Sequence, residues 1–472
     1  MLTIYDPRPS HDCQGFRRRE FLRVGALGMF GLSLPRLLEA SASAAPAVKD
    51  YATGRAVVLL FLGGGPSHIE LFDPKMTAPS EIHSVTGEVK TVLPGVTFGG
   101  TFPQLAALAD KFSIVRSYGS KNAGHEYYPV TTAGNPLKAA FGALYTRIAG
   151  TMNPRTGAPL HTLVLPEAVA PPKYPIGQDF ETAQLPGLTQ TGKLGPNYEA
   201  FNPGGGGQLQ KDMELSIPAA RFNDRKFLLS SLNGIRRQTE SGGQLDTLDN
   251  LQQQAFDVIA RGAAAAFDLS KEDPRTMARY DTSHCFNPEE VQTWGDMRRS
   301  TNLLGRQMLL ARRLVEAGCG FVSVSDCGWD MHSNGNSPKN LAGMRWLGPQ
   351  VDHAVAAFIQ DCEARGLADK VLLVVTGEMG RTPRRNRDGG RDHYGELTPL
   401  LLYGGGLRMG HVVGNSTADA ARPVGEPYAP SHLLATIMHT LFDLSKLRLD
   451  PSLSRDVAAV VQSGQPITPL LR

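Results

Sequence analysis

Short, strongly apolar segments separated by longer stretches of helical spacing constrain the fold of this chain most. The apolar segments cover residues 55–62, 112–117, 320–325, 371–375 and 399–404. The run 371–375 contains only valine and leucine, which suits a strand that is buried on both faces. Helices are predicted at 102–109, 301–317 and 344–366. This alternation predicts an α/β fold with a mostly parallel central sheet and helices on both faces.

The N-terminal region has the features of an export signal. Arg18 and Arg19 precede a glycine-rich apolar run over 24–35, and small residues occupy 40–45. This order predicts a twin-arginine signal peptide at 1–44. The apolar run is too short for a bilayer core, which needs roughly 20 apolar residues. We therefore expect a mature α/β domain at 45–472 that has no membrane anchor and acts in the periplasm or cell envelope.

The charge of the mature chain is close to neutral. Loss of residues 1–44 removes six arginines and four acidic residues, so the net charge falls from +3 to +1. This balance gives no electrostatic basis for binding nucleic acid or an anionic membrane. The spacing of the remaining cysteines, at 285, 319, 327 and 362, matches no zinc ribbon.

Residues 150–215 interrupt the strand and helix alternation. Prolines and glycines are frequent there, and connections of this length are usually lids or mobile excursions with a function. Two further helices are predicted after it, near 224–241 and 244–267. Their leucines and alanines at helical spacing indicate packing.

Polar side chains follow two of the predicted strands. The strand at 371–375 leads to Glu378 and later to His393, and the strand at 320–325 leads to Asp330 and His332. The carboxyl ends of parallel strands meet at one edge of the sheet, where ligands bind. We therefore expect Asp330, His332, Glu378 and His393 to bind a divalent metal ion. Carboxylates and imidazoles suit zinc, manganese, calcium or iron.

Two features near this edge could bind an anion. The planar guanidinium of Arg381 could hold a phosphate, sulfate or carboxylate, and the alternative is an internal ion pair with Glu378 or Asp392. The N–H groups of Gly63–Gly65, after the first predicted strand, could also bind an anion. Asp392 is expected to orient His393.

The order of these motifs resembles the DUF1501 family over nearly the whole mature chain. The motifs are the twin-arginine leader, Gly63-Gly64-Gly65-Pro66-Ser67-His68, Trp329-Asp330-Met331-His332, Gly377-Glu378-Met379-Gly380-Arg381 and Gly390-Arg391-Asp392-His393. That family, abundant in planctomycetes and related bacteria, has no determined function and is grouped with the alkaline phosphatase and sulfatase superfamily. The resemblance implies the superfamily's fold, with metals and a nucleophile at the strand ends.

Carried over residue by residue, the resemblance places Asp330 and His332 on an Asp-then-His metal pattern and His393 on a late ligand histidine. Glu378 stands for the carboxylate of an Asp-His-Gly motif, whose histidine is replaced by methionine in this chain. Glycines replace the metal-binding aspartate after the first strand. His125 lies where the related enzymes have their nucleophile, and Ser67 on the glycine loop is an alternative nucleophile.

These observations predict an exported hydrolase of a sulfate or phosphate ester that works with a metal ion. The catalytic candidates are His125, Ser67, Glu378 and Arg381. Glu378 and His393 could also act as a metal-activated water site or as a general acid–base pair. The alternative function is non-catalytic recognition of a sulfated or acidic polysaccharide at the cell surface. In either case the partner is an anion.

Overall fold

The computed structural model describes residues 50–204, 221 and 264–472. The predicted signal peptide, the predicted helix at 224–241 and most of the predicted helix at 244–267 lie outside these residues. The central sheet has the strand order β11-β4-β10-β7-β1-β6-β5. Its strands are β1 (Ala56–Leu62), β4 (Phe112–Val115), β5 (His161–Val164), β6 (Phe321–Asp326), β7 (Val371–Thr376), β10 (Leu401–Gly404) and β11 (Val412–Val413).

Most neighbouring strands of this sheet run parallel. β1 pairs in parallel with both β6 and β7, β5 pairs in parallel with β6, and β11 pairs in parallel with β4. Only β10 is antiparallel to its two neighbours, β4 and β7. The predicted α/β fold with a mostly parallel sheet is therefore confirmed.

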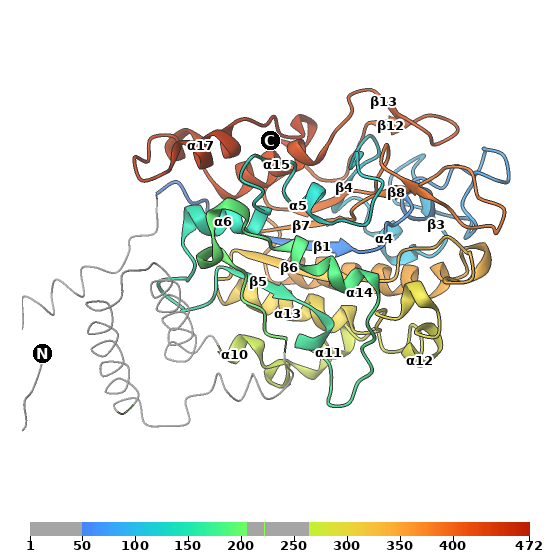
Figure 1. Ribbon diagram of the computed structural model, residues 1–472, viewed down its shortest axis with the longest axis horizontal. Helices are drawn as coiled ribbons and strands as arrows, with labels where there is room; N and C mark the ends of the chain where they lie inside the picture. The colour runs from blue at the N-terminus through green and yellow to red at the C-terminus, as the bar shows by residue number, and fades with distance from the viewer. Residues whose placement is uncertain (1–49, 205–220, 222–263) are drawn as a thin grey trace, which may run out of the picture. The chain divides into compact units, whose positions relative to one another are not determined.

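Helices cover both faces of the sheet, as Figure 1 shows. α13 (Leu304–Glu316), α14 (Met344–Ala364) and α4 (Pro103–Ala107) lie on one face, and α6 (Phe141–Ala149), α15 (Pro430–Leu441) and α17 (Arg455–Gln462) lie on the other. Successive residues of β1 enter the two cores alternately. Val58 and Leu60 pack with the first group of helices, and Val57 and Leu59 pack with the second. This double burial explains why β1 contains no polar residue.

Shorter elements connect these layers. They include the helices α3 (His68–Leu71), α5 (Tyr128–Thr131), α12 (Pro288–Val291) and the 3-10 helices η2 (Phe180–Ala183) and η7 (Gly295–Met297). Three two-stranded sheets pair β2 (Glu88–Lys90) with β3 (Thr97–Gly99), β8 (Gly380–Arg381) with β9 (His393–Tyr394), and β12 (Asn415–Ser416) with β13 (Pro423–Val424). Other short helices are α10 (Ala264–Phe267), α11 (Pro274–Arg279) and α16 (Leu444–Leu447).

The stretch 150–215 contains a strand that the sequence did not predict. β5 forms the edge of the central sheet beside β6, and short 3-10 helices make up much of the described remainder. β5 has only four residues and begins with a histidine and a threonine, so it lacks the apolar run that marks the other parallel strands. Among the described helices, none combines the length and apolar character that a membrane crossing requires.

Candidate functional site

Three histidines surround the carboxylate of Asp330, which follows β6. The Nε2 atoms of His332 and His393 lie 3.1 and 3.5 Å from Oδ1 of Asp330, and Nε2 of His125 lies 3.5 Å from Oδ2. The rings also contact one another, since the centroid of His393 is 4.3 Å from that of His125 and 4.7 Å from that of His332. The structure thus brings residues from three separate parts of the chain into one cluster.

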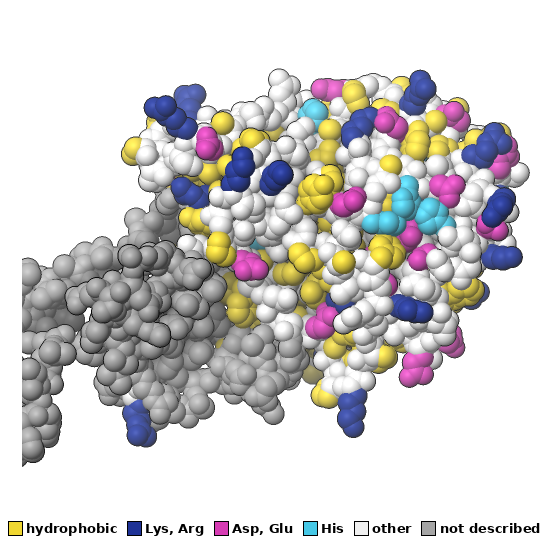
Figure 2. All heavy atoms as spheres, viewed as in Figure 1, with side chains coloured by type: hydrophobic (Ala, Val, Ile, Leu, Met, Phe, Trp, Pro, Cys, Tyr) yellow, Lys and Arg dark blue, Asp and Glu magenta, His cyan; other side chains and the backbone are white. Residues whose placement is uncertain are grey.

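This cluster can be reached from solvent. The side chains of His125, His332 and His393 are 23, 20 and 25% exposed, whereas that of Asp330 is only 7% exposed. Figure 2 shows histidine side chains gathered on one face of the molecule next to acidic side chains. A ligand on that face would therefore meet the imidazoles first, with the carboxylate beneath them.

A short hairpin brings His393 to the cluster. β8 follows β7, and its Arg381 is paired with His393 of β9 in the antiparallel register. The Nδ1 atom of His393 lies 3.1 Å from the carbonyl oxygen of Ala123, and Nδ1 of His332 lies 2.9 Å from Oδ1 of Asp392. We expected Asp392 to orient His393, and this was wrong. The hairpin instead directs Asp392 towards His332, and a backbone carbonyl holds His393.

Arg381 is committed to contacts inside the protein. Its guanidinium pairs with Asp330, and its Nε donates to the carbonyl of Gly65 at 2.7 Å. Further donor contacts reach the carbonyls of Gly64 and Arg391. The side chain is 2% exposed. Of the two alternatives from the sequence, the internal ion pair is the one that the structure contains, with Asp330 as the partner in place of Glu378 or Asp392.

The glycines of the 63–65 loop permit close approach to the segment that carries Asp330. Gly64 has a φ of +105°, and a Cβ atom there would lie 2.5 Å from the backbone nitrogen of Asp330. The N–H of Gly64 donates to Oε1 of Glu378 at 2.9 Å, and the N–H of Gly63 donates to the carbonyl of Asp326 at 2.7 Å. Two N–H groups of the loop therefore already have acceptors, and its role as an anion site stays a prediction.

Glu378 lies behind His125. It is fully buried, and its Oε1 is 3.6 Å from Nδ1 of His125. Burial raises the pKa of Glu378, and the nearby imidazole of His125 opposes this effect. Its second oxygen, Oε2, is buried without a hydrogen-bond partner in the described residues. The carboxylate therefore supports both His125 and the glycine loop from below.

Ser67 is placed differently from the other candidates. It is the N-cap of α3, where its Oγ accepts a hydrogen bond from the N–H of Glu70 at 3.4 Å. In the part of the chain that the structure describes, Ser67 makes no hydrogen bond to the three histidines or to Asp330. The structure thus gives Ser67 a helix-capping contact.

Charge is balanced between the carboxylates and the imidazoles. Burial lowers the pKa of His125, but the nearby carboxylates of Asp330 and Glu378 outweigh it and raise the pKa to about 9. The hydrogen bond with Asp330 is the main reason why the pKa of His332 is raised. Burial raises the pKa of Asp330, yet the three histidines and Arg381 bring it well below its usual range. A cation that binds Asp330 must therefore displace the proton of His125.

The donor atoms fit a divalent metal ion. His125, Asp330 and His393 each offer a ligand atom, and these atoms lie within 4.8 Å of one another. The carbonyl of Ala123 can only accept, so Nδ1 of His393 carries the proton and its Nε2 has the free lone pair. This Nε2 and Nδ1 of His125 are buried without hydrogen-bond partners in the described residues. The group could therefore bind a metal, and imidazole with carboxylate suits zinc, manganese or iron.

The set that could hold a metal differs from the predicted one. We expected Asp330, His332, Glu378 and His393 to be the ligands, with His125 in a catalytic role. The compact group contains His125 with Asp330 and His393. His332 contacts the same oxygen of Asp330 as His393 does, and Glu378 contacts His125.

The sequence did not indicate the residues of η2 that complete the site. Glu181 is fully buried, and it accepts hydrogen bonds from the N–H of Gly328 at 2.9 Å and from the hydroxyl of Tyr127 at 3.0 Å. The ring of Phe180 packs against that of His125 at 4.3 Å. These residues belong to the irregular stretch 150–215, where no strand end or motif marked them.

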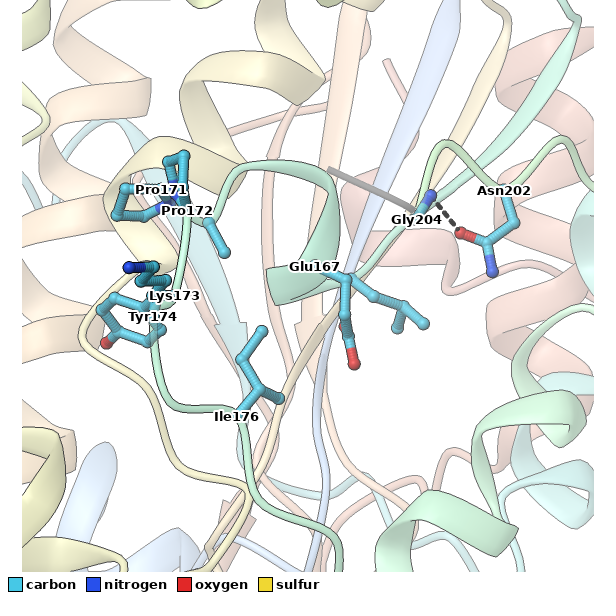
Figure 3. Close-up of a pocket in the computed structure, with 10 residues that line it drawn as sticks. Glu167, Pro171, Pro172, Lys173, Tyr174, Ile176, Asn202 and Gly204 are labelled. Carbon is cyan, nitrogen blue, oxygen red and sulfur yellow. Dashed lines mark hydrogen bonds between the residues drawn. The ribbon is translucent and has the colours of Figure 1, made fainter. Parts of the chain in front are cut away.

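A separate pocket of about 550 Å³ lies away from the histidine cluster. Residues 165–176 and 202–204 form it, with Glu167, Tyr174, Ile176 and Asn202 among the side chains that Figure 3 draws around the hollow. None of its lining residues belongs to the cluster. The donor atoms around Asp330, and not this pocket, locate the candidate site.

Two solved structures match most of this chain at low sequence identity. The sulfatase PsFucS1 from Pseudoalteromonas sp. is 12% identical with a TM-score of 0.36, and the match covers 87% of this chain and 73% of that one. The alkaline phosphatase of the Antarctic bacterium TAB5 is 10% identical with a TM-score of 0.31, over 82% of this chain and 97% of that one. No residue role is carried over from them. Among curated proteins no sequence matches this chain.

A family model described as "Protein of unknown function (DUF1501)" matches residues 54–470. This match spans the whole sheet, from β1 to the C-terminal helices, together with every residue of the cluster. It confirms the resemblance that the motifs indicated. The chain belongs to the DUF1501 family.

Proposed function

We propose that this protein is a metal-dependent hydrolase of a sulfate or phosphate ester. The observation that carries the proposal is the group of His125, Asp330 and His393, whose ligand atoms lie within 4.8 Å of one another on an accessible face. A divalent ion at such a group supplies Lewis acidity, which polarises an ester oxygen and makes water more acidic.

The remaining residues have separate roles in this proposal. Arg381 fixes Oδ1 of Asp330 and the glycine loop, so the carboxylate is oriented before any ligand arrives. Nδ1 of His332 lies against Asp392, and its Nε2 lies 3.1 Å from Oδ1 of Asp330. We therefore assign His332 the role of positioning the carboxylate of Asp330.

Water, and not a side chain, is the nucleophile that we propose. In the described residues no serine, threonine or cysteine side chain bonds to the histidines, to Asp330 or to Glu378. His125, which lies at the position expected for the nucleophile, is engaged by two carboxylates. A serine at 67 caps α3.

Hydrolysis of 4-nitrophenyl sulfate and 4-nitrophenyl phosphate tests the proposal. We expect activity that a chelator abolishes and that zinc or manganese restores, and we expect Asp330→Asn to lose roughly 100-fold or more of it. His439→Gln is the control, because His439 is exposed and the Nδ1 atom of its ring lies 2.8 Å from the carbonyl of Ala435, away from the cluster. A protein that binds no metal, hydrolyses neither ester and retains a sulfated polysaccharide would contradict the proposal and favour the alternative of a binding protein.

We also propose export by the twin-arginine pathway to the periplasm or cell envelope. The support is the sequence of residues 18–45, with paired arginines before a short apolar run and small residues after it. Fractionation of cells that express the full chain provides the test. We expect mature protein outside the cytoplasm and retention of the double variant Arg18→Lys, Arg19→Lys inside. Equal export of both proteins would contradict the assignment.

A further inference from the structure

Glu181 is a fully buried acid that connects separate segments of the site. It belongs to η2, and its side chain carries two hydrogen bonds. Oε1 accepts one from the N–H of Gly328 at 2.9 Å, and Oε2 accepts the other from the hydroxyl of Tyr127 at 3.0 Å. The carboxyl group therefore joins η2 to the loop after β6 and to the segment that carries His125.

Both partners of Glu181 lie next to a proposed metal ligand in the sequence. Gly328 is two residues before Asp330, and Tyr127 is two residues after His125. Tyr127 is itself fully buried, and its ring packs against a phenylalanine of β1 with the centroids 4.7 Å apart. Each hydrogen bond thus fixes the chain beside one ligand, and a single carboxyl group links the two ligands.

The same carboxyl group packs against the glycine loop. A Cβ atom at Gly63 would lie 2.5 Å from Oε2 of Glu181, and a Cβ atom at Gly64 would lie 2.9 Å from Oε1. The carbonyl of Gly63 in turn accepts a hydrogen bond from the N–H of Trp329 at 3.0 Å, directly before Asp330. Glu181 is therefore in contact with the glycine loop, which is itself bonded to the segment that carries Asp330.

The neighbours of Glu181 in η2 hold it in place. Asp179, the N-cap of η2, accepts hydrogen bonds from the N–H of Glu181 at 2.9 Å and from the N–H of Arg299 at 3.2 Å. The ring of Phe180 packs against that of His125 with the centroids 4.3 Å apart. Because the backbone of η2 is fixed in this way, the position of the carboxyl group is fixed as well.

The burial of Glu181 is costly for folding alone. In the described residues no lysine, arginine or histidine forms an ion pair with it, and burial raises the pKa of its carboxyl group well above the usual range. An apolar side chain of similar size would fill the same volume without the cost of removing a carboxyl group from water. The two hydrogen bonds, and the segments that they join, indicate what this residue provides.

We propose that Glu181 is a positioning residue of the metal centre, and that its two hydrogen bonds hold His125 and Asp330 at the separation a divalent ion requires. This inference rests on the metal centre of the proposed function. Glu181 itself is not a ligand, because its two oxygens are bonded to Gly328 and Tyr127. It also takes no part in the chemical step. Residues that orient metal ligands in this way determine the affinity for the ion.

Zinc affinity, measured by calorimetry at one pH, tests this role. Glu181→Met removes both hydrogen bonds and keeps the length of the side chain. We expect it to weaken zinc binding by about 10- to 100-fold, the range for residues that orient metal ligands. Glu181→Gln should retain most of the wild-type affinity, because its amide group can accept from Gly328 and donate to the oxygen of Tyr127.

A second variant covers the case in which Glu181→Met does not fold. Tyr127→Phe removes one of the two hydrogen bonds and retains the packed ring, so it should weaken zinc binding by about 10-fold, the lower end of the same range. If Tyr127→Phe binds zinc as tightly as wild type in that case, the assignment is overturned.

Asp352 provides a matched control for loss of a buried carboxyl group. It is 1% exposed and accepts hydrogen bonds from the N–H groups of Gln104 at 3.0 Å and Leu105 at 2.7 Å, none of which belongs to the cluster. Asp352→Leu should lower stability and leave zinc affinity unchanged.

Three results would overturn the role of Glu181 and leave the hydrolase proposal in place. They are wild-type zinc affinity in folded Glu181→Met, an equal loss in Glu181→Gln, and an equal loss in Asp352→Leu. A wild-type protein that binds no zinc would overturn the metal centre, and this inference with it. A wild-type protein that binds zinc but hydrolyses neither ester would contradict the proposed reaction and leave the role of Glu181 intact.

Discussion

The pairing of His125 with two carboxylates predicts a specific pH dependence of stability in the metal-free protein. The pKa of His125 is raised from 6.5 to about 9. At about 1.36 kcal/mol for each pH unit, this difference corresponds to about 3 kcal/mol of stabilisation. Because the folded pKa lies above the unfolded one, this contribution is complete below pH 6.5. It decreases as the pH rises and is lost above about pH 9.

Urea unfolding in the presence of a chelator measures this contribution. The variant His125→Gln should be less stable than wild type by about 3 kcal/mol at about pH 6, and most of this difference should disappear at about pH 9.5. Other groups that titrate in both proteins, such as His332, cancel in the comparison. His439→Gln, which removes an exposed histidine, should show no pH-dependent difference from wild type. A deficit of His125→Gln that is equal at both pH values would refute the pairing of His125 with Asp330 and Glu378.

Further predictions concern the metal, the glycine loop and the buried arginine. Zinc binding should release protons below pH 9, because His125 must lose its proton. Zinc affinity should therefore rise with pH, by up to about 10-fold for each pH unit and each proton displaced. Calorimetry in buffers of different ionisation enthalpy measures the proton release, and binding without it would contradict the prediction. Gly64→Ala should unfold at a lower urea concentration than Gly54→Ala and should lose zinc binding. Both glycines have a positive φ, but of the two only Gly64 would bring the new Cβ atom to 2.5 and 2.8 Å from backbone atoms. Equal effects of the two changes would argue against the close approach of the loop to Asp330. Arg381→Met should lower the free energy of unfolding, measured with urea, by about 3–5 kcal/mol, because it leaves buried Asp330 without its guanidinium partner. Arg387→Met, at a side chain that is 94% exposed, should lower it by less than about 1 kcal/mol.

The sequence predicted the parts of the site that follow long apolar strands. β6 and β7 are buried on both faces, β7 is apolar except for its last residue, and the polar residues after both strands could be placed at one sheet edge. This reasoning brought Asp330, His332 and Glu378 together. The position of His125 was also identified, though as a candidate nucleophile.

The contacts made by irregular segments could not be predicted in the same way. The β8–β9 hairpin has two residues in each strand, too few for a periodic signal, and it decides that Asp392 faces His332. Glu181 lies in a 3-10 helix, where tertiary packing alone makes it buried. Arg381 donates to backbone carbonyls of loops that are far apart in the sequence, and no local sequence pattern predicts these contacts.

The direct test of this account is a crystal structure of the protein grown with zinc or manganese, with anomalous scattering recorded at the edge of that metal. We expect one anomalous peak within about 2.0–2.5 Å of a nitrogen of His125, an oxygen of Asp330 and a nitrogen of His393. The peak should be absent in Asp330→Asn and present in His439→Gln. A map without a peak among these three residues, whether or not the metal binds elsewhere on the protein, would contradict the metal centre on which the proposed hydrolysis depends.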